Sequence, residues 1–283
     1  MSSLWGSSAS DHFSVRSRQE NFPVATRLLP RAEREHLMAI YAFARLTDDI
    51  GDEAQGDRLA LLDWLDDELD LAFGGEAIHP VFQRLTPMIE ELGLTPEPFR
   101  ALIEANRVDQ RVTRYQTFDD LVGYCMLSAA PIGHLVLSVF HASSPERVAL
   151  SDKICVALQV VEHLQDVGED ARAGRVYLPL EDLAHFGCEV DELSASSAGP
   201  GLRRVVAHEA ERARVLLCEG APLAATLPFR ARIAVEGFVG GGRAVLDALA
   251  KASYDVLATS CTPSKRVLFR YIASSLAGTA GGS

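Results

Sequence analysis

Two groups of polar side chains recur at helical spacing inside apolar stretches. In the first group, Tyr41, Arg45, Asp48 and Asp52 follow one another at steps of four, three and four residues, with Asp49 beside them. Side chains three or four residues apart project from the same face of an α-helix. The pattern therefore predicts one polar stripe, rich in carboxylates, along a single helix.

The position of these carboxylates is unfavourable for an isolated helix. Residues 37–44 are apolar on every face, which indicates a helix enclosed by others. Asp48, Asp49, Asp52 and Glu53 crowd its C-terminal end, where the helix dipole disfavours anions by roughly 0.3 to 1 kcal/mol each. A bound Mg²⁺ would offset this cost, because it takes carboxylate and phosphate oxygens as ligands. From this segment alone, a solvated acidic helix end remains the alternative.

A second stripe follows later in the chain. Gln159, Glu162, Asp166 and Asp170 lie at steps of three, four and four residues in another apolar stretch. Two enclosed helices, each with a DxxxD pair, could face each other across a cavity and share several Mg²⁺ ions. The alternative is that both stripes are ordinary solvent-exposed helix faces. This explanation is weaker, because the stripes lie in apolar stretches and unpaired buried carboxylates are costly.

The elements that position these stripes are expected to be helices. Leucine, alanine, glutamate and arginine recur at spacings of three and four, whereas alternating β-branched runs are scarce. We predict an all-α protein, a single domain over residues 1–283 with loose tails at about 1–18 and 277–283. The predicted helices span residues 32–50, 57–73, 79–92, 96–110, 117–141, 145–168, 201–219, 226–254 and 262–276.

Composition excludes several classes of protein. The chain has 27 Lys+Arg against 39 Asp+Glu, a net charge of −12, which disfavours nucleic acid as a partner. The first twenty residues are too charged for a signal peptide, and the apolar stretch 132–140 is too short to span a bilayer. The five cysteines form no CxxC pair, so neither a disulfide scaffold nor a zinc site is expected. We expect a cytoplasmic protein.

Four ordered stretches carry a resemblance to a known family. They are NFPVA with LLP (residues 21–30), AIYAFARLTDDIGDE (39–53), YCMLSAAPIG (124–133) and QVVEHLQDVGEDARAGRVYLP (159–179). Over about residues 13–275 the chain resembles the squalene and phytoene synthases, which join prenyl diphosphates head to head. Within that family, Ser128–Gly133 is most similar to the bacterial hydroxysqualene synthase branch of hopanoid pathways.

The resemblance implies an isoprenoid synthase fold, a helical bundle around a central cavity, with Mg²⁺ as cofactor and a farnesyl-derived diphosphate as substrate. It makes Asp48 and Asp52 the first metal motif and Asp166 and Asp170 the second. The metal face also includes Asp49, Gln159 and Glu162. The candidates for binding the diphosphate are Arg45, Arg175, Tyr177, Tyr254, Lys265 and Arg266.

The chain departs from the family at two positions on the second stripe. Glu162 stands where the family commonly has Asn, and Gln165 where it often has Arg. The extra negative charge of Glu162 would either tighten Mg²⁺ binding or disturb its geometry.

The expected chemistry is ionisation of an allylic or cyclopropylcarbinyl diphosphate. Mg²⁺ and the arginines neutralise the leaving group, so no protein nucleophile is needed. Of the aromatic residues, Phe22 and Tyr41 are the candidates for stabilising the carbocation, with Arg45 completing the catalytic set, while Phe43 and Tyr124 are assigned to packing. Ser128–Gly133 would either make room for a prenyl chain or form a tight helix contact.

Three functional hypotheses follow. The first is a lyase that converts presqualene diphosphate and water to hydroxysqualene and pyrophosphate. The second is a condensing synthase of the same family, which makes presqualene diphosphate or phytoene. The third is an inactive helical lipid-binding scaffold, which Glu162 favours. Gly237–Gly242 does not fit a dinucleotide fingerprint, so NAD(P)H is not expected. Because the substrate is hydrophobic, we also expect a companion presqualene diphosphate synthase and peripheral contact with the inner face of the membrane.

Overall fold

The computed structural model describes residues 29–258, and these residues are almost entirely helical. Within that range there is no β-strand, only an isolated parallel bridge between Arg114 and Val176. The all-α prediction is confirmed. The helices are α3 (Arg31–Asp52), α4 (Arg58–Phe73), α5 (Pro80–Leu92), α6 (Glu97–Asp109), α7 (Phe118–Ser128), α8 (Ala130–Val139), α9 (Pro145–Arg172), α10 (Leu180–Phe186), α11 (Pro200–Gly220), α12 (Leu223–Thr226) and α13 (Phe229–Lys251), with a 3₁₀ turn at Val190–Ser194.

Local sequence signals account for several helix starts. Asp57 caps α4 by accepting a hydrogen bond from the backbone of Ala60, and Ser144 caps α9 in the same way through Arg147. Thr117 and Asp120 form a reciprocal capping box at the start of α7. These caps satisfy backbone N–H groups that a helix start leaves unpaired.

The structure divides one of the predicted helices. The stretch predicted as one helix at 117–141 breaks at Ala129, which ends α7 and precedes Pro131 in α8. Proline cannot donate the backbone hydrogen bond that a continuous helix requires, so α8 starts anew. The stretch 226–254 corresponds to α13, which begins at Phe229, and the short helices α10 and α12 were not predicted. The predicted helix 262–276 lies outside the described residues.

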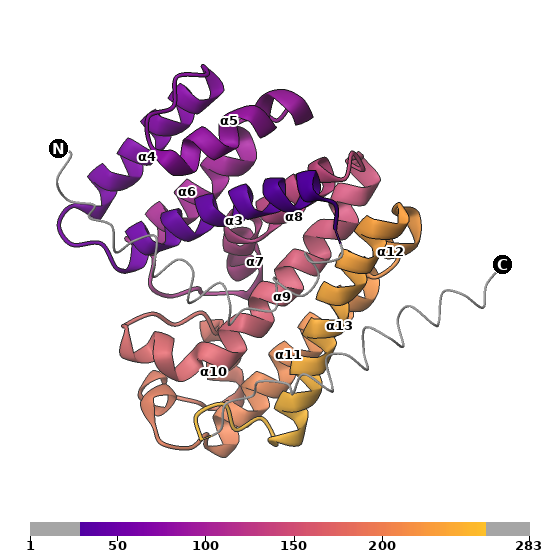
Figure 1. The fold of residues 1–283 in the computed structure, drawn as a ribbon. Coiled ribbons are helices and arrows are strands. Elements are labelled where there is room, and N and C mark those ends of the chain that lie inside the picture. The colour runs from indigo at the N-terminus through magenta and orange to yellow at the C-terminus, as the bar shows by residue number, and fades with distance from the viewer. Residues whose placement is uncertain (1–28, 259–283) are drawn as a thin grey trace.

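Two hydrophobic cores hold these helices together. Helices α3 to α6 enclose one core, which includes Phe43, Phe82 and Phe99 packed edge to face. Helices α7 and α9 to α13 enclose the other, and α8 contributes side chains to both. Figure 1 shows α4 and α5 at one end of the molecule, α10 and α11 at the other, and α9 running between them.

One described segment meets the length and hydropathy of a membrane span. Phe118–Val139 covers α7 and α8, and half of its most apolar window is buried inside the protein. The core helices of globular proteins share this composition, so the segment is weak support for a membrane span. Here Leu121, Cys125 and Leu135 belong to the two cores.

Candidate active site

A polar pocket of about 240 Å³ lies between helices from the two cores. Both predicted carboxylate stripes open into it, from α3 on one side and α9 on the other. The side chains that line it are Asp48, Asp52, Leu102, Ala105, Asn106, Asp109, Tyr124, Ser128, Gln159, Glu162, His163, Asp166, Asp170, Arg175 and Tyr177.

The last turn of α3 presents the first pair of carboxylates through a close contact with α6. A Cβ atom on Gly51 would lie 1.9 Å from Oδ1 of Asn106, so only glycine permits this approach. Asn106 Nδ2 donates to Asp48 Oδ1 at 3.4 Å, and Gln110 Nε2 donates to the Gly51 carbonyl at 3.0 Å. Asp48 is open to the pocket but deep among protein atoms, and this desolvation raises its pKa to about 6.

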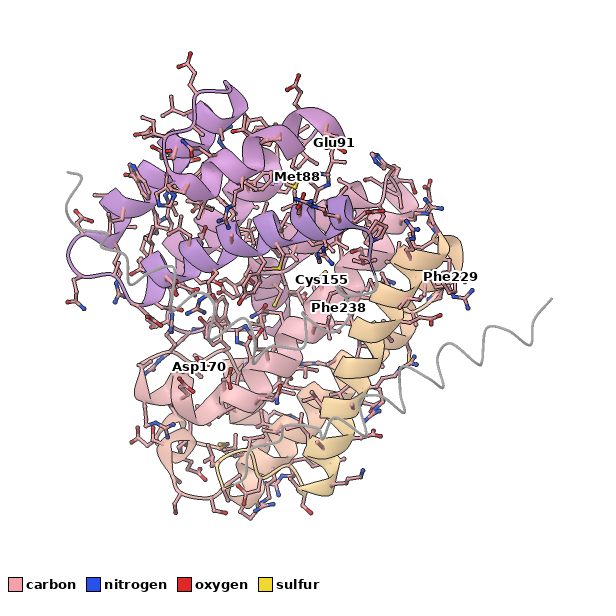
Figure 2. All side chains as sticks on the ribbon, in the orientation of Figure 1. Met88, Glu91, Cys155, Asp170, Phe229 and Phe238 are labelled. Carbon is pink, nitrogen blue, oxygen red and sulfur yellow. The ribbon has the colours of Figure 1, made fainter. Side chains whose placement is uncertain are left out.

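Helix α9 presents the second set of polar groups along one face. The carboxylates were expected to be buried, but Asp52, Glu162 and Asp166 are exposed, because the pocket is open to solvent. Asp170 is half-buried near the C-terminal end of α9, where Figure 2 labels it. Its pKa is raised to about 7 by desolvation and then by the charge of Asp166. The pocket therefore concentrates negative charge that the protein only partly neutralises.

Arg175 links the two sides of the pocket. Its Nη1 donates to Asp52 Oδ1 at 2.7 Å, although the two residues lie on opposite sides of the pocket. Gly174, at φ +83°, turns the chain just after α9, and Val176 N donates to the Thr113 carbonyl at 2.8 Å. This short extended segment holds the guanidinium over the acidic pocket.

A buried network at the wall of the pocket joins the predicted Tyr177 to Asp109 and Tyr124, which were not predicted as part of the site. Asp109 accepts hydrogen bonds from the Tyr124 hydroxyl at 2.6 Å and the Tyr177 hydroxyl at 3.0 Å. Burial raises the pKa of Asp109 and of both tyrosines. Tyr124, which we assigned to packing, lines the pocket. The sequence does contain a signal for this network, because Asn106 and Asp109 are three residues apart and therefore share one face of α6, next to its apolar face.

His163 also lies at the wall and is buried. Its ring stacks on Tyr177 at 3.8 Å between centroids, and Gln159 lies within hydrogen-bond distance at 3.4 Å. Burial, with the nearby charge of Arg175, lowers its pKa to about 3. The imidazole is therefore neutral and forms part of the wall.

Of the predicted residues that the structure describes, four are not among those lining the pocket: Tyr41, Arg45, Asp49 and Tyr254. Arg45 pairs with Asp49 at 2.6 Å and with Glu53 at 3.6 Å, so it neutralises the outer edge of the first stripe. Tyr41 is half-buried on α3, and Tyr254 packs against the core just after α13. Phe22, Lys265 and Arg266 lie outside the described residues.

An apolar pocket of about 220 Å³ adjoins the polar one. The two pockets share Ser128, Gln159 and Glu162 in their linings. Figure 2 shows Cys155 and Phe238, two of its lining residues, close together in the middle of the molecule. Its lining on α9 runs from Ser151 to Glu162, about 16 Å along the helix axis. Ser128, Ala129, Ile132 and Gly133 line this pocket, and the tight helix contact is present, because a Cβ atom on Gly133 would lie 2.3 Å from Ser151 Oγ.

A second cluster of potential metal ligands lies outside both pockets. Ligand atoms of Asp182, His208 and Glu209 are within 4.8 Å of one another. Arg212 Nη1 already donates to Asp182 Oδ2 at 2.6 Å and to Glu209 Oε1 at 2.7 Å, and its guanidinium lies over the Phe118 ring. A cation already occupies the centre of this cluster, so its role is to join α10, α11 and the start of α7.

The chain is similar to known proteins in both sequence and structure. The family model described as squalene/phytoene synthase matches residues 15–270. Hydroxysqualene synthase of Rhodopseudomonas palustris is 37% identical over 212 residues, which cover 74% of this chain and 72% of the relative. Phytoene synthase of Arthrospira platensis is 34% identical over 214 residues, which cover 69% of this chain and 68% of the relative.

Among solved structures, squalene synthase HpnC from Alicyclobacillus acidocaldarius superposes with a TM-score of 0.80 at 45% identity, covering 84% of this chain and 91% of that one. A dehydrosqualene synthase, at 23% identity and a TM-score of 0.86, covers 96% of both chains and shows the same fold. By the extent of the family match and these identities, the chain belongs to the squalene/phytoene synthase family.

Proposed function

We propose that this protein is an Mg²⁺-dependent hydroxysqualene synthase, which converts presqualene diphosphate and water to hydroxysqualene and pyrophosphate. The observation that carries the proposal is the junction of an acidic pocket with an apolar one. A prenyl diphosphate has the same two parts, a charged head and a long apolar tail. The hydroxysqualene synthase relatives support this reaction among those of the family.

The donor set of the polar pocket fits Mg²⁺. Asp48, Asp52, Asp166 and Asp170 offer carboxylate oxygens, the ligands that hard divalent cations prefer. Desolvation, and after it the charge of neighbouring carboxylates, raises the pKa values of Asp48, Asp166 and Asp170. When bound, Mg²⁺ would neutralise the diphosphate and favour its departure. Asp49, Gln159 and Glu162 are the neighbouring groups that we propose for the same metal face.

Cationic and hydroxyl groups of the chain would hold the diphosphate. Arg175 lines the polar pocket, and its guanidinium carries the charged N–H donors that bind phosphate oxygens. Tyr177 lies beside it with its hydroxyl on Asp109. We propose Arg45, Tyr254, Lys265 and Arg266 as further diphosphate-binding residues on the family resemblance alone.

The remaining chain would shelter the carbocation. The apolar pocket excludes bulk water from most of the prenyl chain, and the wall of the polar pocket carries the rings of Tyr124 and Tyr177. An aromatic face stabilises a nearby cation electrostatically. We propose Phe22 and Tyr41 for the same role on the family resemblance.

A condensing synthase is the second candidate, and the phytoene synthase relatives favour it. Such an enzyme joins two prenyl diphosphates, whereas the lyase takes presqualene diphosphate. Purified protein should be incubated with Mg²⁺ and, separately, farnesyl, geranylgeranyl or presqualene diphosphate, without NAD(P)H. Hydroxysqualene from presqualene diphosphate supports the proposal, whereas condensation products from the first two substrates overturn it. Absence of pyrophosphate release from all three would favour a lipid-binding scaffold.

We further propose that the chain works as one domain in the cytoplasm, supplied by a companion presqualene diphosphate synthase. Its substrate and product are long apolar molecules, which supports peripheral contact with the inner face of the membrane. Co-sedimentation with vesicles tests this contact, and protein that stays entirely in the supernatant at all lipid concentrations argues against it.

A further inference from the structure

Ser128 occupies the junction of the two pockets. It is the last residue of α7 and is among the residues that line both the polar and the apolar pocket. The Oγ atom is buried and has no hydrogen-bond partner among residues 29–258. A hydroxyl group in this position faces neither bulk water nor a protein acceptor.

This state is unusual for a serine in a helix. A helical serine generally returns its hydroxyl to the backbone carbonyl four residues earlier. Ser138 in the neighbouring α8 does so, donating to the His134 carbonyl at 3.0 Å. Leaving a buried hydroxyl unpaired costs about 1 to 3 kcal/mol, so such groups generally bind an ordered water or a ligand.

The surroundings of Ser128 suit one water molecule. A buried water needs two to four polar partners. The residues shared by the two pockets are Ser128, Gln159 and Glu162, which provide a hydroxyl, an amide and a carboxylate. The adjoining Ala129, Ile132 and Leu158 are apolar, so on this side of the junction the polar partners come from Ser128, Gln159 and Glu162.

We propose that the Ser128 hydroxyl holds the water molecule that captures the carbocation, and so directs the reaction toward an alcohol. The inference rests on the proposed function and names the residue that selects its product. The junction lies where the reacting carbon must be, because the diphosphate occupies the polar pocket and the prenyl chain the apolar one.

In this step the bond between carbon and the diphosphate oxygen breaks, and both of its electrons leave with the diphosphate. A lone pair of the water oxygen forms the new carbon–oxygen bond. One proton of that water passes to the released pyrophosphate in the adjoining pocket. Without a held water, the cation instead loses a proton from a neighbouring carbon to the same pyrophosphate and becomes an alkene.

The test compares product ratios, not rates. Wild type, Ser128→Ala, Ser128→Thr and Ser138→Ala are incubated with presqualene diphosphate and Mg²⁺ in ¹⁸O-water, and alcohol and alkene are quantified per pyrophosphate released. We expect ¹⁸O in the alcohol, and an alcohol-to-alkene ratio about threefold to tenfold lower in Ser128→Ala, the effect of one hydrogen bond. Ser128→Thr, which keeps a hydroxyl, should retain the wild-type preference.

Ser138→Ala removes a hydroxyl outside both pockets and should leave the ratio unchanged. An unchanged ratio in Ser128→Ala, or an equal fall in Ser138→Ala, overturns the inference. If Ser128→Ala does not fold by circular dichroism, Ser128→Cys gives the same comparison with a much weaker hydrogen-bonding group. Failure of the proposed function is a separate outcome, because it appears in the wild type as the absence of any alcohol.

Discussion

At the scale of single residues, the carboxylates of the polar pocket explain why its charge needs a partner. Asp48 and Asp52 come from α3, and Asp166 and Asp170 from α9. Arg175 pairs with Asp52 and bridges the two sides, but one guanidinium does not neutralise four carboxylates. Mg²⁺ together with an anionic diphosphate would complete the balance of charge.

Replacing Asp48 or Asp166 with asparagine should abolish most activity and leave the fold intact. Each change removes a proposed metal ligand, so we expect pyrophosphate release to fall at least about 100-fold. The neutral amide relieves repulsion, so the melting temperature without metal should not fall. Pyrophosphate release and thermal unfolding measure the two effects.

A binding assay is the control for these variants. Mg²⁺ with pyrophosphate should raise the melting temperature of the wild type, and this gain should be lost in both variants. Full activity in either variant would refute the model of two metal-binding motifs.

Glu162 tests whether the departure from the family lies at the metal. It lines both pockets, on the same face of α9 as Asp166. If its carboxylate binds Mg²⁺, Glu162→Asn should raise the Mg²⁺ concentration for half-maximal rate by several-fold, and Glu162→Ala should raise it further. Three coincident Mg²⁺ titrations would show that Glu162 acts elsewhere.

At the scale of elements, α9 is the helix on which both pockets depend. It lines the apolar pocket from Ser151 to Glu162 and the polar pocket from Gln159 to Asp170. Its close crossing with α11 fixes its position. A Cβ atom on Gly220 of α11 would lie 2.8 Å from the Leu150 carbonyl and 2.6 Å from Ile154.

Gly220→Ala should therefore destabilise the protein. The obstacle includes the backbone of α9, which cannot move aside as a flexible side chain can, so we expect a loss of about 1 to 3 kcal/mol in the free energy of unfolding. Gly123→Ala is the matched control, because Gly123 is exposed within α7 and no described atom lies within 4 Å of a Cβ there. That change should stabilise by about 0.5 to 1 kcal/mol through helix propensity. Equal effects in urea denaturation would mean that the crossing is not tight.

At the scale of the whole molecule, few charged side chains of the described residues are buried, and these lie where helices contact one another. Glu209 is one of them, almost fully buried between Asp182, His208 and Arg212. Desolvation raises its pKa to about 8, despite the opposing effect of Arg212. Between its ordinary pKa and this value, the folded protein holds a proton that the unfolded chain has released.

This shift predicts that Glu209 makes the protein less stable as the pH rises. The stability that the protonated group contributes is complete below its ordinary pKa of 4.5 and is lost as the pH rises toward about 8. Glutamine does not titrate, so the melting temperature of Glu209→Gln relative to wild type should increase steadily from pH 5 to pH 9. His208, Asp182 and Arg212 are present in both proteins, so the part of their titration that does not depend on Glu209 cancels in this difference. A difference that is constant or decreases with pH would contradict the assignment.

Periodicity along the chain was sufficient to predict the all-α fold, most helix positions and the two polar stripes. These features are local, because a helix places residues three and four apart on one face whatever surrounds it. The resemblance to the squalene and phytoene synthases likewise rests on motifs within single helices, and the family comparison confirms it.

Contacts between distant segments were decided only in the tertiary structure. The sequence does not show that Asn106 and Asp109 of α6 join the pocket, that Arg175 reaches Asp52, or that the carboxylates stay open to solvent. It also does not show that the Ser128 hydroxyl lacks a partner where two pockets meet. Each of these depends on which helix faces pack together, and side-chain volume, close glycine contacts and burial settle that choice across the whole chain.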